Sequence, residues 1–267
     1  MDDILTISAK KLGWLAQPDF CERCFYMKSH LNWKQPWAMA MPIYMTLDKL
    51  QKKFITDVID ATGKAPPWMS ELGDVVGHIE PPNYRQFFYI NSDHGVRVWG
   101  NADLIPVMAD GSLAIVDLKT AKPKGNLDHL ASTYLVQQNA YALAAEYQNL
   151  GKVKHLALLY MTAMADGEVS TAPAEGQAGN MVVPFAATLH RLEFKPDLVD
   201  DLCGRFRELS ERTEMPDARE GCKDCQLTEQ IHLAYAASKD TAVPLAVAHR
   251  DHISQRELYA RHLGLAR

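Results

Sequence analysis

Residues 100–122, GNADLIPVMADGSLAIVDLKTAK, combine two strand patterns with a turn. The runs LIPVM and SLAIVDLK are rich in β-branched and aliphatic residues, and the tripeptide at 109–111 is typical of a hairpin turn. The stretch therefore predicts an antiparallel hairpin. Asp103 lies on one arm, and Asp117 and Lys119 lie at the end of the other.

The turn decides whether the two carboxylates of this hairpin share a face. A two-residue turn at Asp110 and Gly111 would place Asp103 opposite Leu118, on the wrong face relative to Asp117. We therefore predict a three-residue loop or a β-bulge, which is common beside active sites.

Two carboxylates that meet at a strand end are suitable ligands for Mg²⁺. The carbonyl of Leu118, between Asp117 and Lys119, is available as a further ligand. Lys119 and Asp117 project to the same face because they are two residues apart on a strand, so the lysine can orient a water or brace a phosphate. A bound metal can activate water and neutralise charge on a phosphodiester. Most Asp-x-Lys tripeptides are simply solvated, so the next helix carries the argument.

The segment LASTYLVQQNAYALAAEY, residues 130–147, has helical periodicity that places Gln137 on the buried face together with Tyr141. A buried glutamine needs hydrogen-bond partners, because desolvating an unpaired amide is costly. A site at the strand ends would provide such partners.

The order of the predicted elements indicates an α/β protein. We expect helices over the first 60 residues, including LTISAKKLGWLA, and a loop-rich connection around the prolines at 66–82. The predicted division is an N-terminal helical region (1–80), an α/β core (81–195) and a C-terminal helical region (196–267) that packs on the N-terminal region.

Further elements are expected after the long helix. They are a strand at 153–163, a Gly/Ala-rich loop at 166–180, a strand pair around 181–185 and 188–194, a helix opened by Pro196, and a helical tail broken near Pro244. Cys203 lies on the apolar stripe of the helix after Pro196, which indicates a small buried thiol.

The bulk composition, with 47% hydrophobic and 23% charged residues, is that of a globular protein. No apolar run approaches the roughly 20 residues that cross a bilayer, and the N-terminus lacks a secretory signal. We therefore expect a cytoplasmic protein without membrane association, whose five cysteines serve metal binding or burial. The net charge of −5 gives no general attraction for nucleic acid, but a local basic groove is compatible with it. The lysines cluster at Lys49, Lys52 and Lys53 and at Lys119, Lys122 and Lys124.

Three short motifs occur in order: Gly100-x-x-Asp103, Asp117-x-Lys119 and Gln137-x-x-x-Tyr141. Together they resemble the nuclease motifs of the RecB-type branch of the PD-(D/E)XK superfamily over about residues 85–165. The resemblance implies a restriction-endonuclease-like core, a mixed sheet flanked by helices. It also implies that the two aspartates bind Mg²⁺ or Mn²⁺, that Lys119 is the catalytic lysine, and that Gln137 and Tyr141 support the site and contact DNA.

Relatives in this branch often carry a further metal ligand, a His or Glu, on an upstream helix. This chain has no His-x-x-x-Glu there, and Asp48 is the nearest acidic candidate. The alternative for Asp48 is an ordinary solvent-exposed carboxylate.

Cys21-x-x-Cys24 and Cys222-x-x-Cys225 form two matched pairs at opposite ends of the chain. Four thiolates can enclose one metal, so we expect a shared structural site that clasps a helical subdomain. The segment FCERCFYMK resembles the N-terminal cysteine segment of the CRISPR-associated iron–sulfur exonucleases, in which terminal cysteines hold an iron–sulfur cluster. Those relatives place one cysteine early and three late in the chain, whereas this chain has two early and two late. Because of this difference, Zn²⁺ and a [4Fe–4S] cluster are both open as the bound group.

These observations predict a metal-dependent deoxyribonuclease that acts as an exonuclease on single-stranded or frayed DNA ends, with protein partners in a DNA-processing complex. Its role would be DNA processing, repair, recombination or defence. One alternative is a non-cleaving nucleic-acid-binding or complex-assembly protein on a nuclease fold. A second alternative is a metal-clasped redox or scaffold protein in which the cysteines carry the function.

Overall fold

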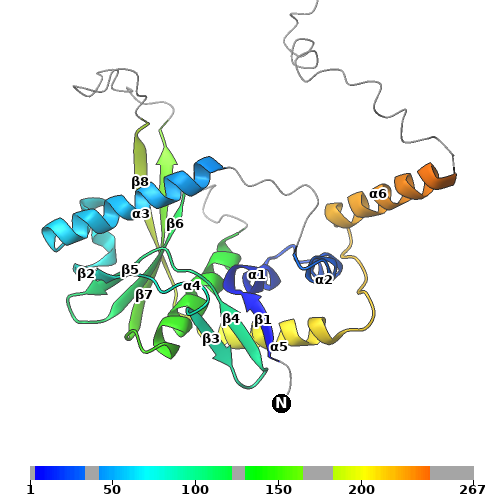
Figure 1. Cartoon of the computed structure of the whole chain (residues 1–267), viewed down its shortest axis with the longest axis horizontal. Helices are drawn as coiled ribbons and strands as arrows, with labels where there is room; N and C mark the ends of the chain where they lie inside the picture. Colours follow the sequence, from blue (N-terminus) through cyan, green and yellow to red (C-terminus); the bar gives the residue numbers. More distant parts are fainter. Residues whose placement is uncertain (1–3, 34–41, 122–129, 165–182, 241–267) are drawn as a thin grey trace, which may run out of the picture. The chain divides into compact units, whose positions relative to one another are not determined.

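The structure is a computed structural model that describes residues 4–33, 42–121, 130–164 and 183–240 (Figure 1). The chain divides into two compact units, Met1–Pro216 and Asp217–Arg267. No helix in the described ranges combines the length and apolar character that a bilayer crossing requires. Several sequence predictions lie outside the described residues: the loop at 166–180, Lys122, Lys124 and the break near Pro244.

The first unit contains a five-stranded sheet in the order β2-β5-β6-β7-β8. Its strands are β2 Val75–Ile79, β5 Ile105–Met108, β6 Leu113–Lys119, β7 Val153–Ala163 and β8 Phe185–Leu192. Strands β6 and β7 are parallel and the other neighbours are antiparallel, so the sheet is mixed as predicted. The central strand β6 is buried except at Lys119, which fits its nearly continuous aliphatic sequence.

Side chains of β6 alternate between two hydrophobic cores. Leu113 and Ile115 belong to the core that includes helix α4 (Ala131–Tyr147), whereas Val116 and Leu118 belong to the core that includes helix α3 (Pro42–Thr62). Helix α4 also makes the crossover between the parallel strands β6 and β7. Helices therefore flank both faces of the mixed sheet (Figure 1), which confirms the predicted α/β architecture.

A smaller sheet has the order β1-β4-β3. Its strands are β1 Leu5–Ser8, β4 Val96–Trp99 and β3 Phe88–Asn91, with β1 parallel and β3 antiparallel to β4. Ile7, Val96 and Val98 are buried in the same core as α4. The other helices of this unit are α1 Ala9–Gly13, α2 Glu22–His30 and α5 Asp197–Glu211, with 3-10 turns at Trp14–Ala16 and Pro67–Leu72.

The helical prediction for the first 60 residues is wrong at Leu5–Ser8, which forms β1. The β-branched Thr6 and Ile7 favour a strand, and the pairing partner Val96 to Trp99 lies about 90 residues away, so local periodicity does not reveal it. The segment predicted as loop-rich at 66–82 contains β2. In the described part of the predicted strand pair around residues 181–194, one strand forms, β8.

The hairpin of β5 and β6 has the predicted three-residue loop. The Met108 amide donates to the Ser112 carbonyl at 2.8 Å, and the pairs Val107 with Leu113 and Leu104 with Val116 set the register. The same register places residue 103 opposite residue 117. The predicted three-residue loop is therefore confirmed, and with it Asp103 and Asp117 lie on the same face at one end of the hairpin.

Helix α5 begins directly after Pro196, as predicted, and buries the stripe Val199, Leu202, Cys203, Phe206 and Leu209. Cys203 is fully buried, and desolvation raises the pKa of its thiol to about 12, which suits an inert core residue. In the second unit, helix α6 spans Lys223–Asp240 and Cys222 precedes it.

Candidate active site

Asp103 and Asp117 form the centre of the candidate site. Asp103 lies just before β5, and one of its carboxylate oxygens accepts a hydrogen bond of 2.8 Å from the Leu118 amide. This bond ties the end of one hairpin arm to the backbone of the other. Asp117 is only 3% exposed, whereas the side chain of Asp103 keeps 14% of its surface exposed. The two carboxylates therefore offer one buried and one accessible oxygen donor.

Lys119 follows Asp117 on the same face of β6, as its spacing predicts. Its ammonium forms an ion pair with the Asp117 carboxylate. The same ammonium lies 4.1 Å from the ring centroid of Tyr134, a cation–π contact from α4. A lysine held by a carboxylate and a ring has a restricted position, so it presents a localised positive charge at the end of the strand.

Gln137 lies on the buried face of α4, as predicted, with 6% exposure. Its amide nitrogen donates to the Asp117 carboxylate at 3.3 Å and to the Tyr141 hydroxyl at 2.9 Å. These bonds orient Asp117 from the side of the helix. The Gln137 carbonyl oxygen has no hydrogen-bond partner among the residues that the structure describes, so a buried acceptor remains beside the carboxylate.

The glycine of the first motif is explained by close packing. A Cβ added to Gly100 would lie 2.0 Å from Cε1 of the Tyr141 ring. Only a residue without a side chain allows this approach, which brings the backbone before Asp103 against the tyrosine that supports Gln137. Gly100-x-x-Asp103 and Gln137-x-x-x-Tyr141 are therefore one packing unit.

Lys52 on α3 is the residue that sequence reasoning missed. Its ammonium lies 2.7 Å from the Asp103 carboxylate and 2.8 Å from the Asp48 carboxylate. Asp48, the candidate upstream ligand, thus reaches the site through Lys52. The available signal was the i,i+4 pair Asp48 and Lys52 on one helix, but the sequence does not show that this helix approaches Asp103.

Burial and charge shift the ionisation of the site. Burial raises the pKa of Asp117, and the nearby Lys119 charge opposes this effect. Desolvation lowers the pKa of Lys52, but its contacts with Asp103 and Asp48 outweigh this cost and leave the pKa raised. Burial also raises the pKa of Tyr141 to about 12. Asp103 and Asp117 thus each contact a lysine, Lys52 and Lys119 respectively.

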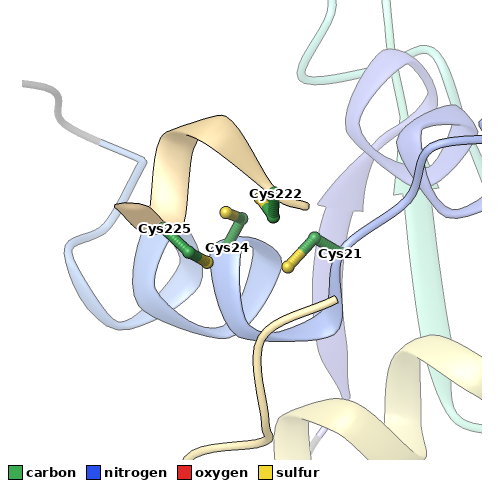
Figure 2. Close-up of side chains that lie close together, drawn as sticks. All are labelled: Cys21, Cys24, Cys222 and Cys225. Carbon is green, nitrogen blue, oxygen red and sulfur yellow. The ribbon is translucent and has the colours of Figure 1, made fainter. Parts of the chain in front are cut away.

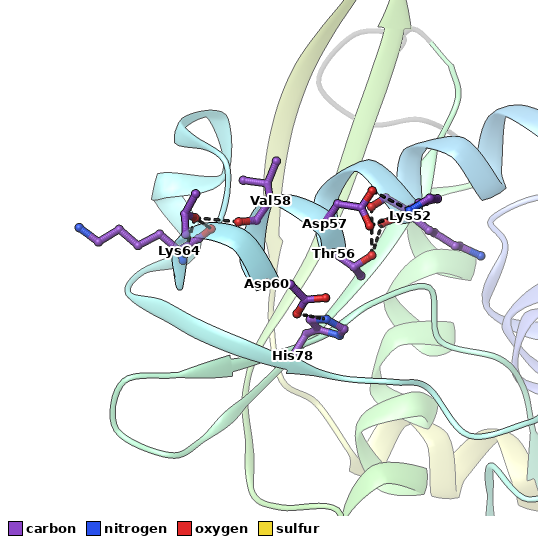
Figure 3. A network of polar contacts seen from close by, with 9 residues as sticks. Lys52, Thr56, Asp57, Val58, Asp60, Lys64 and His78 are labelled. Atoms are coloured by element: carbon purple, nitrogen blue, oxygen red, sulfur yellow. Dashed lines mark hydrogen bonds and ion pairs between the residues drawn. The ribbon is translucent and has the colours of Figure 1, made fainter.

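A cavity of about 460 Å³ lies on the α3 side of the site. Asp103 and Asn101 line it together with Asp48, Lys52 and the end of β2. Figure 3 shows the polar side chains along α3, including Lys52, and the contact of Asp60 with His78 at 3.0 Å. The exposed oxygen donor of the site therefore opens toward a polar, water-accessible space.

The donor set around the hairpin fits a hard divalent cation. Asp103 and Asp117 supply carboxylate oxygens, and the unpartnered carbonyl of Gln137 adds an acceptor for a water in the same place. Oxygen-only ligands with room for water are typical of Mg²⁺ and Mn²⁺ sites. The chemistry that such a site supports is attack by an activated water on a phosphodiester.

The four predicted cysteine ligands are all buried. Cys21 precedes α2 and Cys24 lies in its first turn, while Cys222 and Cys225 have the corresponding positions at α6. Within each pair the two sulfur atoms lie within 4.8 Å of each other, and Figure 2 shows the four side chains. Four buried thiols in two such pairs could bind a metal ion or a metal cluster.

The sequence and the fold were compared with curated proteins, solved structures and protein-family models. No curated protein matches the chain. The fold is similar to a solved structure titled "Crystal structure of SSO0001", with a TM-score of 0.41 and 14% sequence identity over 81% of each chain. The family model of the PD-(D/E)XK nuclease superfamily matches residues 51–230, a range that contains Lys52, both hairpin aspartates and Gln137 and excludes Asp48. Since the match spans well over half of the 267 residues, the chain belongs to the PD-(D/E)XK nuclease superfamily.

Proposed function

We propose that this protein is a metal-dependent deoxyribonuclease that acts as an exonuclease on single-stranded or frayed DNA ends. The observation that carries the proposal is the convergence of Asp103 and Asp117 at the end of one hairpin, each already paired with a lysine. Membership in a nuclease superfamily supports the reaction class. The preference for DNA ends rests on the sequence resemblance.

In this proposal Asp103, Asp117 and the Leu118 carbonyl would hold Mg²⁺ or Mn²⁺, with Asp48 as a further candidate ligand. The bound ion supplies Lewis acidity and a water of lowered pKa. The protein supplies the positions. The bond from the Leu118 amide fixes the Asp103 carboxylate, so that its second oxygen points toward the cavity side, where Lys52 contacts it.

Lys119 is the proposed catalytic lysine. Its ammonium is held by Asp117 and by the Tyr134 ring, so it can brace a phosphate oxygen or orient the attacking water without a large rearrangement. Gln137 and Tyr141 are positioning residues, because they act on Asp117 through the bonds of 3.3 and 2.9 Å. Outer hydrogen bonds of this kind typically change metal affinity or activity by roughly 10- to 100-fold.

We further propose that the four cysteines bind one structural Zn²⁺ or one [4Fe–4S] cluster. The support is the two matched Cys-x-x-Cys pairs, whose four thiols are all buried. Elemental analysis of the purified protein for zinc and iron distinguishes the two, since a cluster also gives visible absorption that zinc does not. A protein with neither metal after anaerobic purification would contradict this assignment.

The test of the proposed reaction is hydrolysis of end-labelled DNA and RNA, single- and double-stranded, with Mg²⁺, Mn²⁺ or EDTA. We expect metal-dependent release of short products from DNA, lost in Asp117→Ala and Lys119→Ala at matched folding. Cleavage that is unaffected by both substitutions would place the chemistry elsewhere. Binding of nucleic acid without cleavage under every condition would instead favour a non-cleaving binding protein.

A further inference from the structure

One face of the three-stranded sheet carries aromatic and arginine side chains. Phe88 lies opposite Trp99, and Ile90 opposite Arg97, in the register of β3 and β4, so these residues share a face. The alternate residues Val96 and Val98 are buried in the core. On the opposite side of the strands from this core, Phe88, Arg97 and Trp99 keep part of their surface exposed to solvent.

Tyr84 and Arg85 extend this face beyond the strand. The Tyr84 ring is 5.4 Å from the Trp99 ring, and its side chain is 43% exposed. The Arg85 guanidinium lies 5.7 Å from the Tyr84 ring, and the Arg97 guanidinium lies 4.2 Å from the Phe88 ring. We name these five residues, Tyr84, Arg85, Phe88, Arg97 and Trp99, the sheet platform.

The two guanidinium groups of the sheet platform are held without neutralisation. Arg97 donates to the Arg85 carbonyl at 2.7 Å, and Arg85 donates to the Tyr84 hydroxyl at 3.2 Å. Within the described residues neither arginine forms an ion pair with a carboxylate. By contrast, Arg205, Arg207 and Arg212 each pair with a glutamate. The sheet platform therefore combines partly exposed aromatic side chains with two positive charges, a combination that suits a polyanion.

The chain runs directly from the sheet platform into the candidate active site. Trp99 is followed by Gly100, which packs on Tyr141, and by Asn101 and Asp103, which line the cavity. Four residues span at most about 14 Å, so Trp99 lies close to the proposed metal ligand. Glu80 and Pro81, which precede Tyr84, line the same cavity. A bound strand could thus continue from the platform to the carboxylates.

We propose that the sheet platform binds single-stranded nucleic acid next to the active site, with bases stacked on Tyr84 and Trp99 and phosphates held by Arg85 and Arg97. Stacking of bases on aromatic rings and phosphate contacts from arginine are the two components of single-strand binding. Duplex bases are already stacked and cannot use the rings. The inference rests on the proposed nuclease function and names the surface that guides the single strand to its site.

The test measures binding of a fluorescein-labelled thymidine oligonucleotide and of a duplex, with EDTA present to prevent hydrolysis, over a range of salt concentrations. The variants are Tyr84→Ala and Arg85→Ala, which alter exposed side chains and spare the Arg85 carbonyl that Arg97 uses. Lys64→Ala is the matched control, because it removes one exposed positive charge just after α3, which ends at Thr62. Thermal melting confirms that each variant folds.

We expect Tyr84→Ala to weaken binding of the single strand roughly tenfold, the scale of one lost base stack, without changing the salt dependence. Arg85→Ala should lower the slope of log affinity against log salt by roughly 0.7, the value for one phosphate on a single strand. Oligonucleotide should quench Trp99, and Trp99→Phe should remove that quenching. Lys64→Ala should bind as wild type.

Wild-type affinity in both platform variants, equal affinity for duplex and single strand, or equal competition by polyglutamate would overturn the inference. Equal competition by polyglutamate would show that the surface binds any polyanion through its charge, without stacking of bases. None of these outcomes touches the proposed reaction, which the metal-dependent hydrolysis assay judges separately. Conversely, loss of hydrolysis in Asp117→Ala with unchanged platform binding would support both proposals.

Discussion

Substitution of Gly100 by alanine tests the packing that joins two sequence motifs. The added Cβ would lie 2.0 Å from the Tyr141 ring and 2.8 Å from the next ring carbon. Tyr141 is buried and hydrogen-bonded to Gln137, so it cannot move aside without breaking contacts. Overpacking of this kind costs about 1–3 kcal/mol. We therefore expect Gly100→Ala to lower Tm by roughly 4–8 °C, taking ~2 kcal/mol and ~2–4 °C per kcal/mol for a chain of this size.

The assay is thermal unfolding followed by circular dichroism, with Gly77→Ala as the matched control. Gly77 lies in β2, has a backbone that other residues adopt, and has no neighbour within 4 Å of its added Cβ, so its substitution should change stability by less than about 0.5 kcal/mol. Tyr141→Ala removes the clash, so Gly100→Ala should cost little in that background. Equal melting temperatures for Gly100→Ala and Gly77→Ala would show that Gly100 is not needed for packing against Tyr141.

Three further predictions concern charge, hydrogen bonding and metal. Lys52→Met should lower Tm more in EDTA than in Mg²⁺, because bound Mg²⁺ would neutralise the Asp103 carboxylate that has lost its lysine. Equal shifts of Tm in the two buffers would contradict this. Gln137→Leu preserves buried volume but removes two hydrogen bonds, so hydrolysis should fall roughly 10- to 100-fold, whereas an unchanged rate would exclude a positioning role. Cys222→Ser should lower bound metal and Tm, whereas Cys203→Ser should retain the metal, as elemental analysis can check; equal metal content in the two variants would remove Cys222 from the site.

The core of the site could be predicted from the sequence because its residues are linked by local rules. Parity along the hairpin required a loop of three residues if Asp103 and Asp117 were to meet, and the loop has that length. Helical periodicity placed Gln137 on the buried face, where it contacts Asp117. Period-two and period-3.6 patterns depend on neighbouring residues alone, so a single sequence carries them.

The missed features depend on contacts between distant segments. β1 pairs with β4 across about 90 residues, and its short sequence continues into a helix, so the periodicity of the following residues dominated the interpretation. Lys52 has an ordinary helix-surface sequence context, and its role follows only from the approach of α3 to Asp103. The sheet platform was also missed, because Phe88 and Trp99 share a face only after β3 and β4 pair, and Tyr84 contacts Trp99 only in the folded chain.

The proposed metal-dependent nuclease site can be tested by comparing two acid-x-lysine pairs at strand ends. Asp117 and Lys119 end β6 in the candidate site, whereas Glu193 and Lys195 follow β8 as an exposed ion pair of 2.7 Å. Hydrolysis of end-labelled single-stranded DNA in Mg²⁺ should be lost in Asp117→Asn and retained in Glu193→Gln, with both proteins folded. Equal activity in the two variants, or activity that persists in EDTA, would contradict a metal-dependent nuclease site at Asp103 and Asp117.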